Sequence, residues 1–255
     1  MSRTSCKTMR NALQWFHKGF RQTPVESDPE RAYDLWAASY DHQPENLVLF
    51  LETGLFASLI SSEDMAGKII YDVGCGTGRH WPNIISSGPA AITGFDVSEE
   101  MLQALRRKHQ EYSLHKIDTH LLPAPDETCD LLISTLALAH IADGEAALTE
   151  WYRVLRPGGK IILTDYHPTA LDAGANRTFR HKGKLVAVKN YIHPVERLLQ
   201  HAAALGLQAE QQQERHIDPS VRDWYERQHA LHVYERFRGT PILYGVCLSK
   251  AYVAA

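Results

Sequence analysis

The chain has 255 residues and a formal net charge of −3 with neutral histidines. This length suffices for one sizeable core, and the charge gives no bulk attraction to nucleic acid or to an anionic membrane surface. No apolar run is long enough for a membrane span, and the four cysteines form no C-x-x-C pair of the kind found in zinc sites. We therefore expect a cytoplasmic protein with no nucleic-acid partner, no membrane span and no metal.

The N-terminal segment is basic, with no acidic residue before Glu26. Two interpretations remain open for it. Residues 1–25 form an organellar transit peptide, or residues 1–27 form a basic segment or helix that docks on the rest of the protein. No internal repeat or low-complexity tract follows, so residues 28–255 are expected to form a single domain.

Two helices are expected before the first strand, at residues 29–41 and 45–61. Asp28 and Pro29 indicate the start of the first, because aspartate is a good N-cap and proline is favoured at the first helical position. Tyr33, Trp36 and Tyr40 recur in this segment at helical spacing. A stripe of this kind packs either against a core or over a binding pocket.

Strands and helices then alternate, which is typical of a parallel sheet with helices on both faces. The predicted strands are 69–73, 91–95, 112–116, 129–134, 160–164, 207–214 and 242–252. The predicted helices are 79–86, 99–110, 144–155 and 194–204. Pro157–Gly158 is a turn pair that begins the fifth strand, and Gly206 is a natural helix end.

Two segments, 166–193 and 216–240, lie outside this alternation and are rich in His, Tyr and Arg. Ligands bind at the carboxyl ends of the strands in open α/β sheets. We therefore expect both insertions to form, with the N-terminal helices, a cover over the binding site of an acceptor molecule.

The most informative motif is Asp72-Val73-Gly74-Cys75-Gly76-Thr77-Gly78, which joins the first strand to a helix. Its G-x-G-x-G spacing differs from the dinucleotide fingerprint G-x-G-x-x-G. The carboxylate of Asp72 suits a cationic ligand better than a pyrophosphate, because like charges repel. A nicotinamide-dependent oxidoreductase is therefore disfavoured.

A second carboxylate, Asp96, ends the next strand, at the roughly 20-residue spacing expected for a group that binds ribose hydroxyls. Ser98 is a good N-cap for the following helix, which places Met101 in the first turn. Asp118 and Thr119 follow the third strand. A carboxylate there can meet the exocyclic amine of a purine.

Together these segments resemble the class I S-adenosylmethionine-dependent methyltransferases, and the resemblance covers roughly residues 30–165. The matching segments are 72–78, 94–102, Asp118 with Leu122-Pro123, 129–132 and 154–160. The resemblance implies a seven-stranded, mostly parallel Rossmann-like sheet with helices on both faces and a helical N-terminal cover. It also implies that the last strand inserts antiparallel between strands five and six, and that S-adenosylmethionine is the cofactor.

The resemblance assigns a donor site residue by residue. In that assignment the glycines let the backbone approach the donor, Asp72 meets its ammonium group, Asp96 holds the ribose and Asp118 contacts the adenine. The expected donor-binding residues are Tyr40, Asp72, Gly74, Cys75, Gly76, Gly78, Asp96, Val97, Met101, Asp118, Thr119 and Thr135.

The expected reaction is methyl transfer to a small-molecule acceptor, with an oxygen or carbon nucleophile preferred. Histidines that follow strands four and five, His140 and His167, are the candidate catalytic bases, and His193 is a third candidate. No Asn-Pro-Pro-Tyr-type motif follows strand four, where amino-methylating enzymes often carry one. The alternative is a non-catalytic donor-binding module or regulatory partner that kept the fold.

Overall fold

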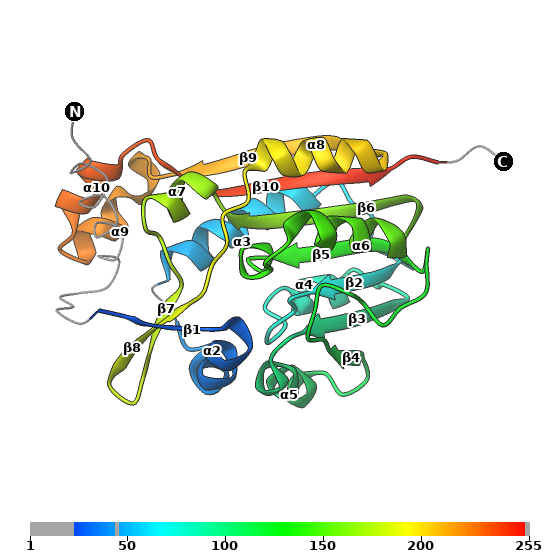
Figure 1. The fold of residues 1–255 in the computed structure, drawn as a ribbon, viewed down its shortest axis with the longest axis horizontal. Coiled ribbons are helices and arrows are strands. Elements are labelled where there is room, and N and C mark those ends of the chain that lie inside the picture. The colour runs from blue at the N-terminus through cyan, green and yellow to red at the C-terminus, as the bar shows by residue number, and fades with distance from the viewer. Residues whose placement is uncertain (1–22, 44–45, 253–255) are drawn as a thin grey trace.

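The computed structural model describes residues 23–43 and 46–252 of the chain (Figure 1). Within these residues, seven strands form the main sheet in the order β4-β3-β2-β5-β6-β10-β9. In chain order they are β2 (Ile69–Val73), β3 (Ala91–Asp96), β4 (Ser113–Lys116), β5 (Cys129–Thr135), β6 (Leu155–Tyr166), β9 (Leu207–His216) and β10 (Pro241–Lys250). All neighbouring pairs from β4 to β6 are parallel.

The last strand, β10, lies between β6 and β9 and pairs with both in antiparallel orientation. The predicted Rossmann-like sheet with an antiparallel last strand is therefore confirmed. Its central strands are near-continuous apolar runs, such as Leu131–Ile133 of β5, because helices cover both faces of a parallel sheet.

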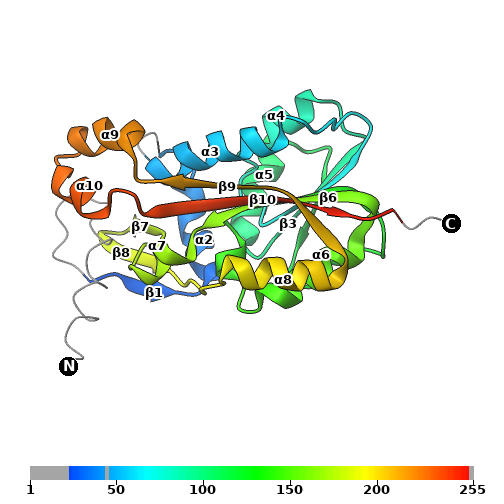
Figure 2. The same cartoon turned by 90° about the horizontal axis from the view of Figure 1, so that it is seen from above.

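The covering helices form two layers, which Figure 2 shows from above. The helices of one layer are α3 (Leu47–Ile60), α4 (Trp81–Ser86) and α5 (Glu99–Lys108), and those of the other are α6 (Gly144–Val154) and α8 (Val195–Leu205). Each layer has its own apolar core. Trp81 is fully buried in the first and Trp151 in the second.

Local signals in the sequence set where these helices begin and end. Ser98 Oγ accepts a hydrogen bond from Met101 N at 3.1 Å and caps α5. Asp143 Oδ1 accepts from Ala146 N at 2.9 Å and caps α6. Gly206 ends α8 with a φ of 94°, a left-handed conformation that favours glycine. The other predicted helices are present with ends that shift by up to two residues, but the helix predicted at 29–41 ends at Trp36 and continues as a 3-10 turn over Ala37–Ser39.

The start of the fifth strand differs from the prediction. β6 begins at Leu155, which pairs with Cys129 of β5, and so starts before the predicted first residue, 160. A register shift follows before Leu131 pairs with Lys160. Gly158 has the positive φ of 78° expected for the second residue of a Pro-Gly turn. The Pro157–Gly158 turn is thus absorbed as an irregularity inside the strand.

A second, smaller sheet has the order β1-β8-β7 and joins residues near the start of the described chain to the segment that follows β6. The elements outside the main layers are β1 (Val25–Ser27), α2 (Pro29–Trp36), the 3-10 turn η2 (Ala37–Ser39), α7 (Pro168–Asp172), β7 (Thr178–His181), β8 (Lys184–Val188), α9 (Arg222–Arg227) and α10 (Leu231–Phe237). They gather toward the end of the main sheet where its parallel strands finish (Figure 1).

Most of the predicted basic segment or helix, residues 1–27, lies outside the described residues, and the strand β1 (Val25–Ser27) forms its last three residues. No helix within residues 23–43 and 46–252 is both long and apolar enough to span a membrane.

Candidate functional site

The glycine-rich turn leaves β2 in a conformation that depends on its glycines. Gly74, Gly76 and Gly78 all have positive φ, of 75°, 52° and 76°. Gly74 N and Cys75 N both donate to Phe95 O, at 2.7 and 3.1 Å, which ties the turn to the end of β3. A Cβ added at Gly74 would lie 2.3 Å from the Cβ of Ala137. The backbone there must pass too close to the loop after β5 for any side chain.

Asp96, at the end of β3, is fixed by the same turn. Its Oδ2 accepts from Gly76 N at 2.7 Å, and its Oδ1 accepts from Ser98 N at 2.9 Å. Burial raises the pKa of Asp96 to about 6, although the backbone N–H groups of Ser98 and Gly76 oppose this rise. Each carboxylate oxygen keeps lone-pair capacity, so Asp96 can still accept hydrogen bonds from the hydroxyls of a ligand.

A cavity of about 400 Å³ opens beside these groups at the carboxyl edge of the sheet. Its size lies within the range of small-molecule and cofactor sites. It extends from the loops after β3 and β4 to α2 and the segment before α6. The predicted site residues on its lining are Tyr40, Gly74, Gly76, Asp96, Val97, Met101, Asp118, Thr119, Thr135 and His140.

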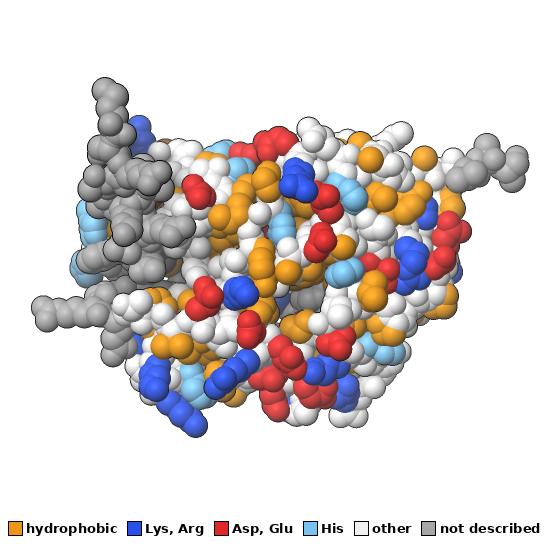
Figure 3. Space-filling view, in the orientation of Figure 1, with side chains coloured by type: hydrophobic (Ala, Val, Ile, Leu, Met, Phe, Trp, Pro, Cys, Tyr) orange, Lys and Arg blue, Asp and Glu red, His pale blue; other side chains and the backbone are white. Residues whose placement is uncertain are grey.

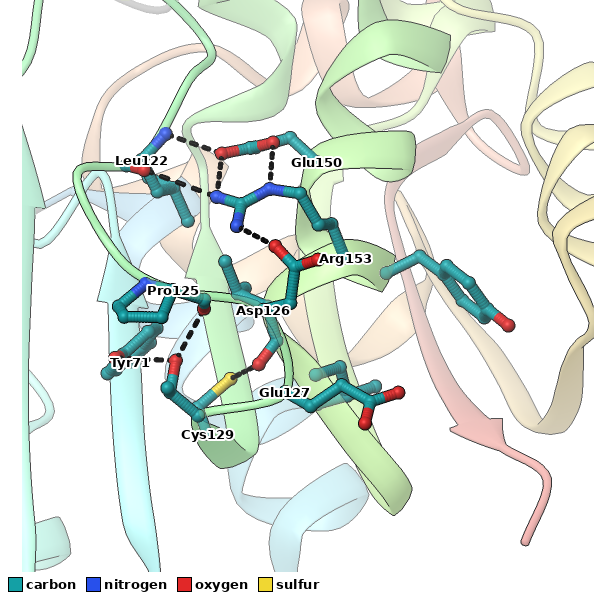
Figure 4. A network of polar contacts seen from close by, with 12 residues as sticks. Tyr71, Leu122, Pro125, Asp126, Glu127, Cys129, Glu150 and Arg153 are labelled. Carbon is teal, nitrogen blue, oxygen red and sulfur yellow. Dashed lines mark hydrogen bonds and ion pairs between the residues drawn. The ribbon is translucent and has the colours of Figure 1, made fainter. Parts of the chain in front are cut away.

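The loop that carries Asp118 and Thr119 continues to Leu122, which takes part in a polar network around Arg153 of α6 (Figure 4). Arg153 donates to both oxygens of Glu150 and to Asp126 Oδ1, while Glu150 Oε1 accepts from Leu122 N at 2.7 Å. The hydrogen bonds from Arg153 hold the pKa of Glu150 below its ordinary value. This network fixes the downstream end of the loop and so limits where its cavity-lining residues can lie.

Asp72 lies behind the glycine turn and does not line the cavity. Its Oδ2 accepts from Trp81 Nε1 at 2.7 Å, whereas its buried Oδ1 has no partner within the described part of the chain. Burial raises the pKa of Asp72 to about 7, with the Trp81 hydrogen bond opposing the rise. The unpartnered oxygen is a position that a cationic group can satisfy, directly or through water.

Cys75 and Gly78 also lie outside the cavity lining. Cys75 is 6% exposed, and burial raises the pKa of its thiol well above the ordinary value, so the side chain stays a neutral core group. A Cβ at Gly78 would lie 2.4 Å from Leu105 Cδ1 of α5. Both residues contribute to the close packing of the turn against α4 and α5.

His140 lines the cavity and has both ring nitrogens engaged. Its Nδ1 lies 2.9 Å from Lys189 O, and its Nε2 lies 2.9 Å from the hydroxyl of Tyr33. A carbonyl can only accept, so Nδ1 carries the proton and Nε2 accepts from Tyr33. Burial lowers the pKa of His140 to about 4, and burial raises that of Tyr33 well above its ordinary value. Both groups are therefore neutral near pH 7.

His167 follows β6 but lies outside the cavity lining. Its Nδ1 accepts from Thr169 N at 3.2 Å and caps α7, and its Nε2 lies 3.5 Å from Glu214 Oε1. His193, the third candidate, has Nε2 2.9 Å from Ile141 O and does not line the cavity. Of the three histidines, only His140 is placed where it can meet a bound acceptor.

The sequence analysis did not single out Arg177, which the structure brings to this region. Arg177 is 3% exposed and its guanidinium lies over the rings of Trp36 and Tyr40, 5.4 and 5.6 Å from their centroids. Its Nη2 donates to the Tyr40 hydroxyl at 2.9 Å. The signal that could have found it is the aromatic stripe of α2, since stacked guanidinium groups are common partners of such rings.

Metal ligation receives little support within residues 23–43 and 46–252. One group there, Glu63, Glu210 and Cys247, has ligand atoms close enough to share an ion. The ammonium of Lys160 lies 2.8 Å from Glu63 and 2.7 Å from Glu210. This lysine already supplies the positive charge that the two carboxylates need.

Comparison with known proteins agrees with the fold and the glycine turn. Residues 71–163 match a family model described as a methyltransferase domain. These residues, which include the glycine turn and Asp96, are similar to a methyltransferase domain. The resemblance to S-adenosylmethionine-dependent methyltransferases that the motifs predicted is confirmed by this match.

Individual relatives are similar over part of their length. A demethylmenaquinone methyltransferase of Tropheryma whipplei is 27% identical over 164 residues, which cover 63% of this chain and 62% of that protein. A fatty-acid O-methyltransferase of Mycolicibacterium smegmatis is 32% identical over 117 residues, covering 45% of this chain and 43% of that protein. The chain thus spans less than two thirds of the length of both curated relatives.

A solved structure, an S-adenosylmethionine dependent methyltransferase from Mesorhizobium loti, has a TM-score of 0.60 against this chain at 19% identity. The likeness covers 78% of this chain and 97% of that one. At this identity it supports the shared fold, and the choice of substrate depends on the residues of the cavity.

Proposed function

We propose that this protein transfers a methyl group from S-adenosylmethionine to a small-molecule acceptor, at an oxygen or a carbon atom. The observation that carries the proposal is the position of Asp96, which joins the glycine turn by a hydrogen bond and lines the cavity of about 400 Å³. The curated relatives support a small acceptor, since one is named for demethylmenaquinone and another for fatty acids.

The residues present fit the donor. Asp96 has free acceptor capacity for ribose hydroxyls, and Asp118 and Thr119 line the cavity where a purine edge would need polar partners. The positive φ of Gly74 and the contact that a Cβ would make there leave room only for a bare backbone beside the ligand. The unpartnered Oδ1 of Asp72 matches the ammonium of an amino acid. When bound, S-adenosylmethionine supplies a methyl group on a sulfonium sulfur.

The protein's own part in the reaction is to align the acceptor and to exclude water. Holding two reactants in line can contribute on the order of 7–11 kcal/mol to lowering a barrier. Tyr33, Tyr40 and His140 close the cavity on the side of the cover, and Arg177 holds Tyr40 in place. A nucleic-acid substrate is not expected, because the net charge is −3 and acidic and basic side chains are interspersed over the face in Figure 3.

Titration calorimetry of the full chain with S-adenosylhomocysteine tests the donor site. We expect saturable binding that Asp96→Ala weakens at least tenfold, because the variant removes the ribose acceptor. Asp96→Asn keeps the shape of the side chain and separates loss of charge from loss of structure. Asp223→Ala, on an exposed carboxylate of α9, is the matched control and should bind as the wild type does.

A second assay with S-adenosylmethionine and candidate acceptors follows methyl transfer by mass spectrometry. Binding without transfer across a broad acceptor panel would favour the non-catalytic module. Uptake of a nicotinamide dinucleotide in place of the methyl donor would overturn the proposal, and unchanged affinity in Asp96→Ala would remove Asp96 from the site.

A further inference from the structure

Arg177 carries a buried positive charge with an incomplete set of partners. Its Nη2 donates to Tyr40, but its Nη1 is buried and has no hydrogen-bond partner among the described residues. No carboxylate within residues 23–43 and 46–252 forms an ion pair with it, although the chain forms many ion pairs elsewhere. The guanidinium remains charged, because arginine does not lose its proton in proteins.

A buried cation without a directly paired carboxylate destabilises the folded state. The buried Asp165 interacts with Arg177 electrostatically, but its two oxygens accept from backbone N–H groups and form no ion pair with the guanidinium. Stacking on the rings of Trp36 and Tyr40 offsets part of this effect, since each cation–π contact contributes on the order of 1–2 kcal/mol. Full desolvation of an ion still costs several kcal/mol after relaxation. The arrangement therefore favours any anion that can come within reach of Arg177.

Tyr40 connects this charge to the cavity. Its hydroxyl accepts a hydrogen bond from Arg177 Nη2 at 2.9 Å, and Tyr40 lines the cavity. Among the described residues, the Tyr40 hydroxyl proton has no acceptor of its own. A hydroxyl that accepts from a guanidinium becomes a better donor, because neighbouring hydrogen bonds polarise one another. Tyr40 can thus present a charge-assisted donor to a ligand.

We propose that the acceptor is a carboxylic acid, bound as its carboxylate to the Tyr40 hydroxyl with Arg177 as the counter-ion behind it, and that the product is a methyl ester. This inference rests on the proposed function. One carboxylate oxygen accepts from Tyr40. The other forms the new bond to the methyl carbon, while the bond from that carbon to sulfur breaks and sulfur keeps the electron pair. No proton moves in this step.

The position of His140 agrees with a reaction that needs no base. Both of its ring nitrogens are engaged, by Lys189 O and by the Tyr33 hydroxyl, each at 2.9 Å. A neutral alcohol or phenol would require a free lone pair to take its proton. A carboxylate is already deprotonated at neutral pH and makes no such demand.

The test compares carboxylates with their primary amides on the full chain saturated with S-adenosylhomocysteine. Calorimetry measures the affinities of propionate and propionamide, benzoate and benzamide, and octanoate and octanamide. We expect at least one carboxylate to bind tenfold or more tightly than its amide. The same carboxylate, incubated with S-adenosylmethionine, should yield its methyl ester.

Arg177→Met should abolish the preference for the carboxylate, bringing the two affinities within twofold, and leave the affinity for S-adenosylhomocysteine within threefold of wild type. Its midpoint of thermal unfolding should stay equal or rise, because a buried charge has gone; a merely structural arginine would lower the midpoint and leave the preference intact. Arg180→Met, on the exposed arginine of β7, is the matched control and should behave as the wild type does.

The two proposals fail in different ways. If S-adenosylhomocysteine binds but the wild type prefers none of the three carboxylates over its amide, the carboxylate inference is overturned and the methyl-donor site stands. The inference is also overturned if a neutral phenol is methylated at the same rate by the wild type and by Arg177→Met. If S-adenosylhomocysteine does not bind, the proposed function itself fails.

Discussion

Replacing Asp72 with Asn separates the charge of this side chain from its shape. Asp72 is 5% exposed, and its Oδ2 accepts from Trp81 Nε1 at 2.7 Å. The amide oxygen of an asparagine can accept the same hydrogen bond, so this contact with α4 is retained. The substitution removes one negative charge and converts one acceptor into a donor.

The size of the effect follows from the pKa of Asp72, which burial raises from 3.8 to about 7. A carboxyl whose pKa is raised on folding stabilises the folded state below its unfolded pKa, and this stability is lost as the pH rises through the folded pKa. The rise corresponds to roughly 4 kcal/mol, of which roughly 3 kcal/mol falls between pH 5 and pH 8. Without donor, Asp72→Asn should therefore be more stable than wild type by about 1 kcal/mol at pH 5 and by up to about 4 kcal/mol at pH 8.

Donor binding should change in the opposite sense. The ionised Oδ1 is the proposed partner of the donor's ammonium group, so Asp72→Asn should weaken the binding of S-adenosylhomocysteine at pH 8 by tenfold or more. Urea unfolding at the two pH values and calorimetry measure the two effects, with Asp223→Asn on exposed α9 as the control. An unchanged pH dependence of unfolding would refute the assignment of this titration to Asp72. A gain in stability with full donor affinity would remove Asp72 from the donor site.

Two further predictions concern the turn and the histidines. Gly74→Ala should lower the free energy of unfolding by about 1–3 kcal/mol more than Gly67→Ala does. Both positions have positive φ, but only an alanine at position 74 would place its Cβ against Ala137. Equal losses of unfolding free energy for the two variants, measured with urea, would contradict the clash. His140→Ala should keep donor affinity within threefold and lower turnover at least tenfold, since it removes the buried acceptor of the Tyr33 hydroxyl. His167→Ala should turn over within twofold of wild type, because His167 does not line the cavity. Equal turnover rates for the two variants would contradict this difference.

The main sheet and its carboxyl edge could be predicted because their determinants are local. Strand–helix alternation fixes a parallel sheet, and a parallel sheet brings the end of β2 next to the end of β3. Asp96 therefore had to lie beside the glycine turn once both strands were recognised. The positive φ of Gly74 and Gly76 likewise follows from the close approach of the turn to its neighbours.

The sequence predicted which segments form the cover, but not which of their side chains contact one another. Tyr33 and His140 are 107 positions apart, and Arg177 and Tyr40 are 137 apart, so no periodicity relates them. Their contacts depend on how β8 pairs with β1, which is a short parallel pairing with no local turn signal. His167 followed a strand end as His140 did, and only the packing of α7 and Glu214 around it shows that it is turned away from the cavity.

The distribution of charge around the cavity suits a reaction in which two charges disappear. Transfer from a sulfonium to a carboxylate gives an uncharged thioether and an uncharged ester, and a site that excludes water favours such a step. A guanidinium in direct contact with the attacking oxygen would oppose it by stabilising the anion. Because Arg177 acts through the Tyr40 hydroxyl, it can draw in the carboxylate and leave the second oxygen reactive. The ester then carries no charge for Arg177 to hold, which favours its release.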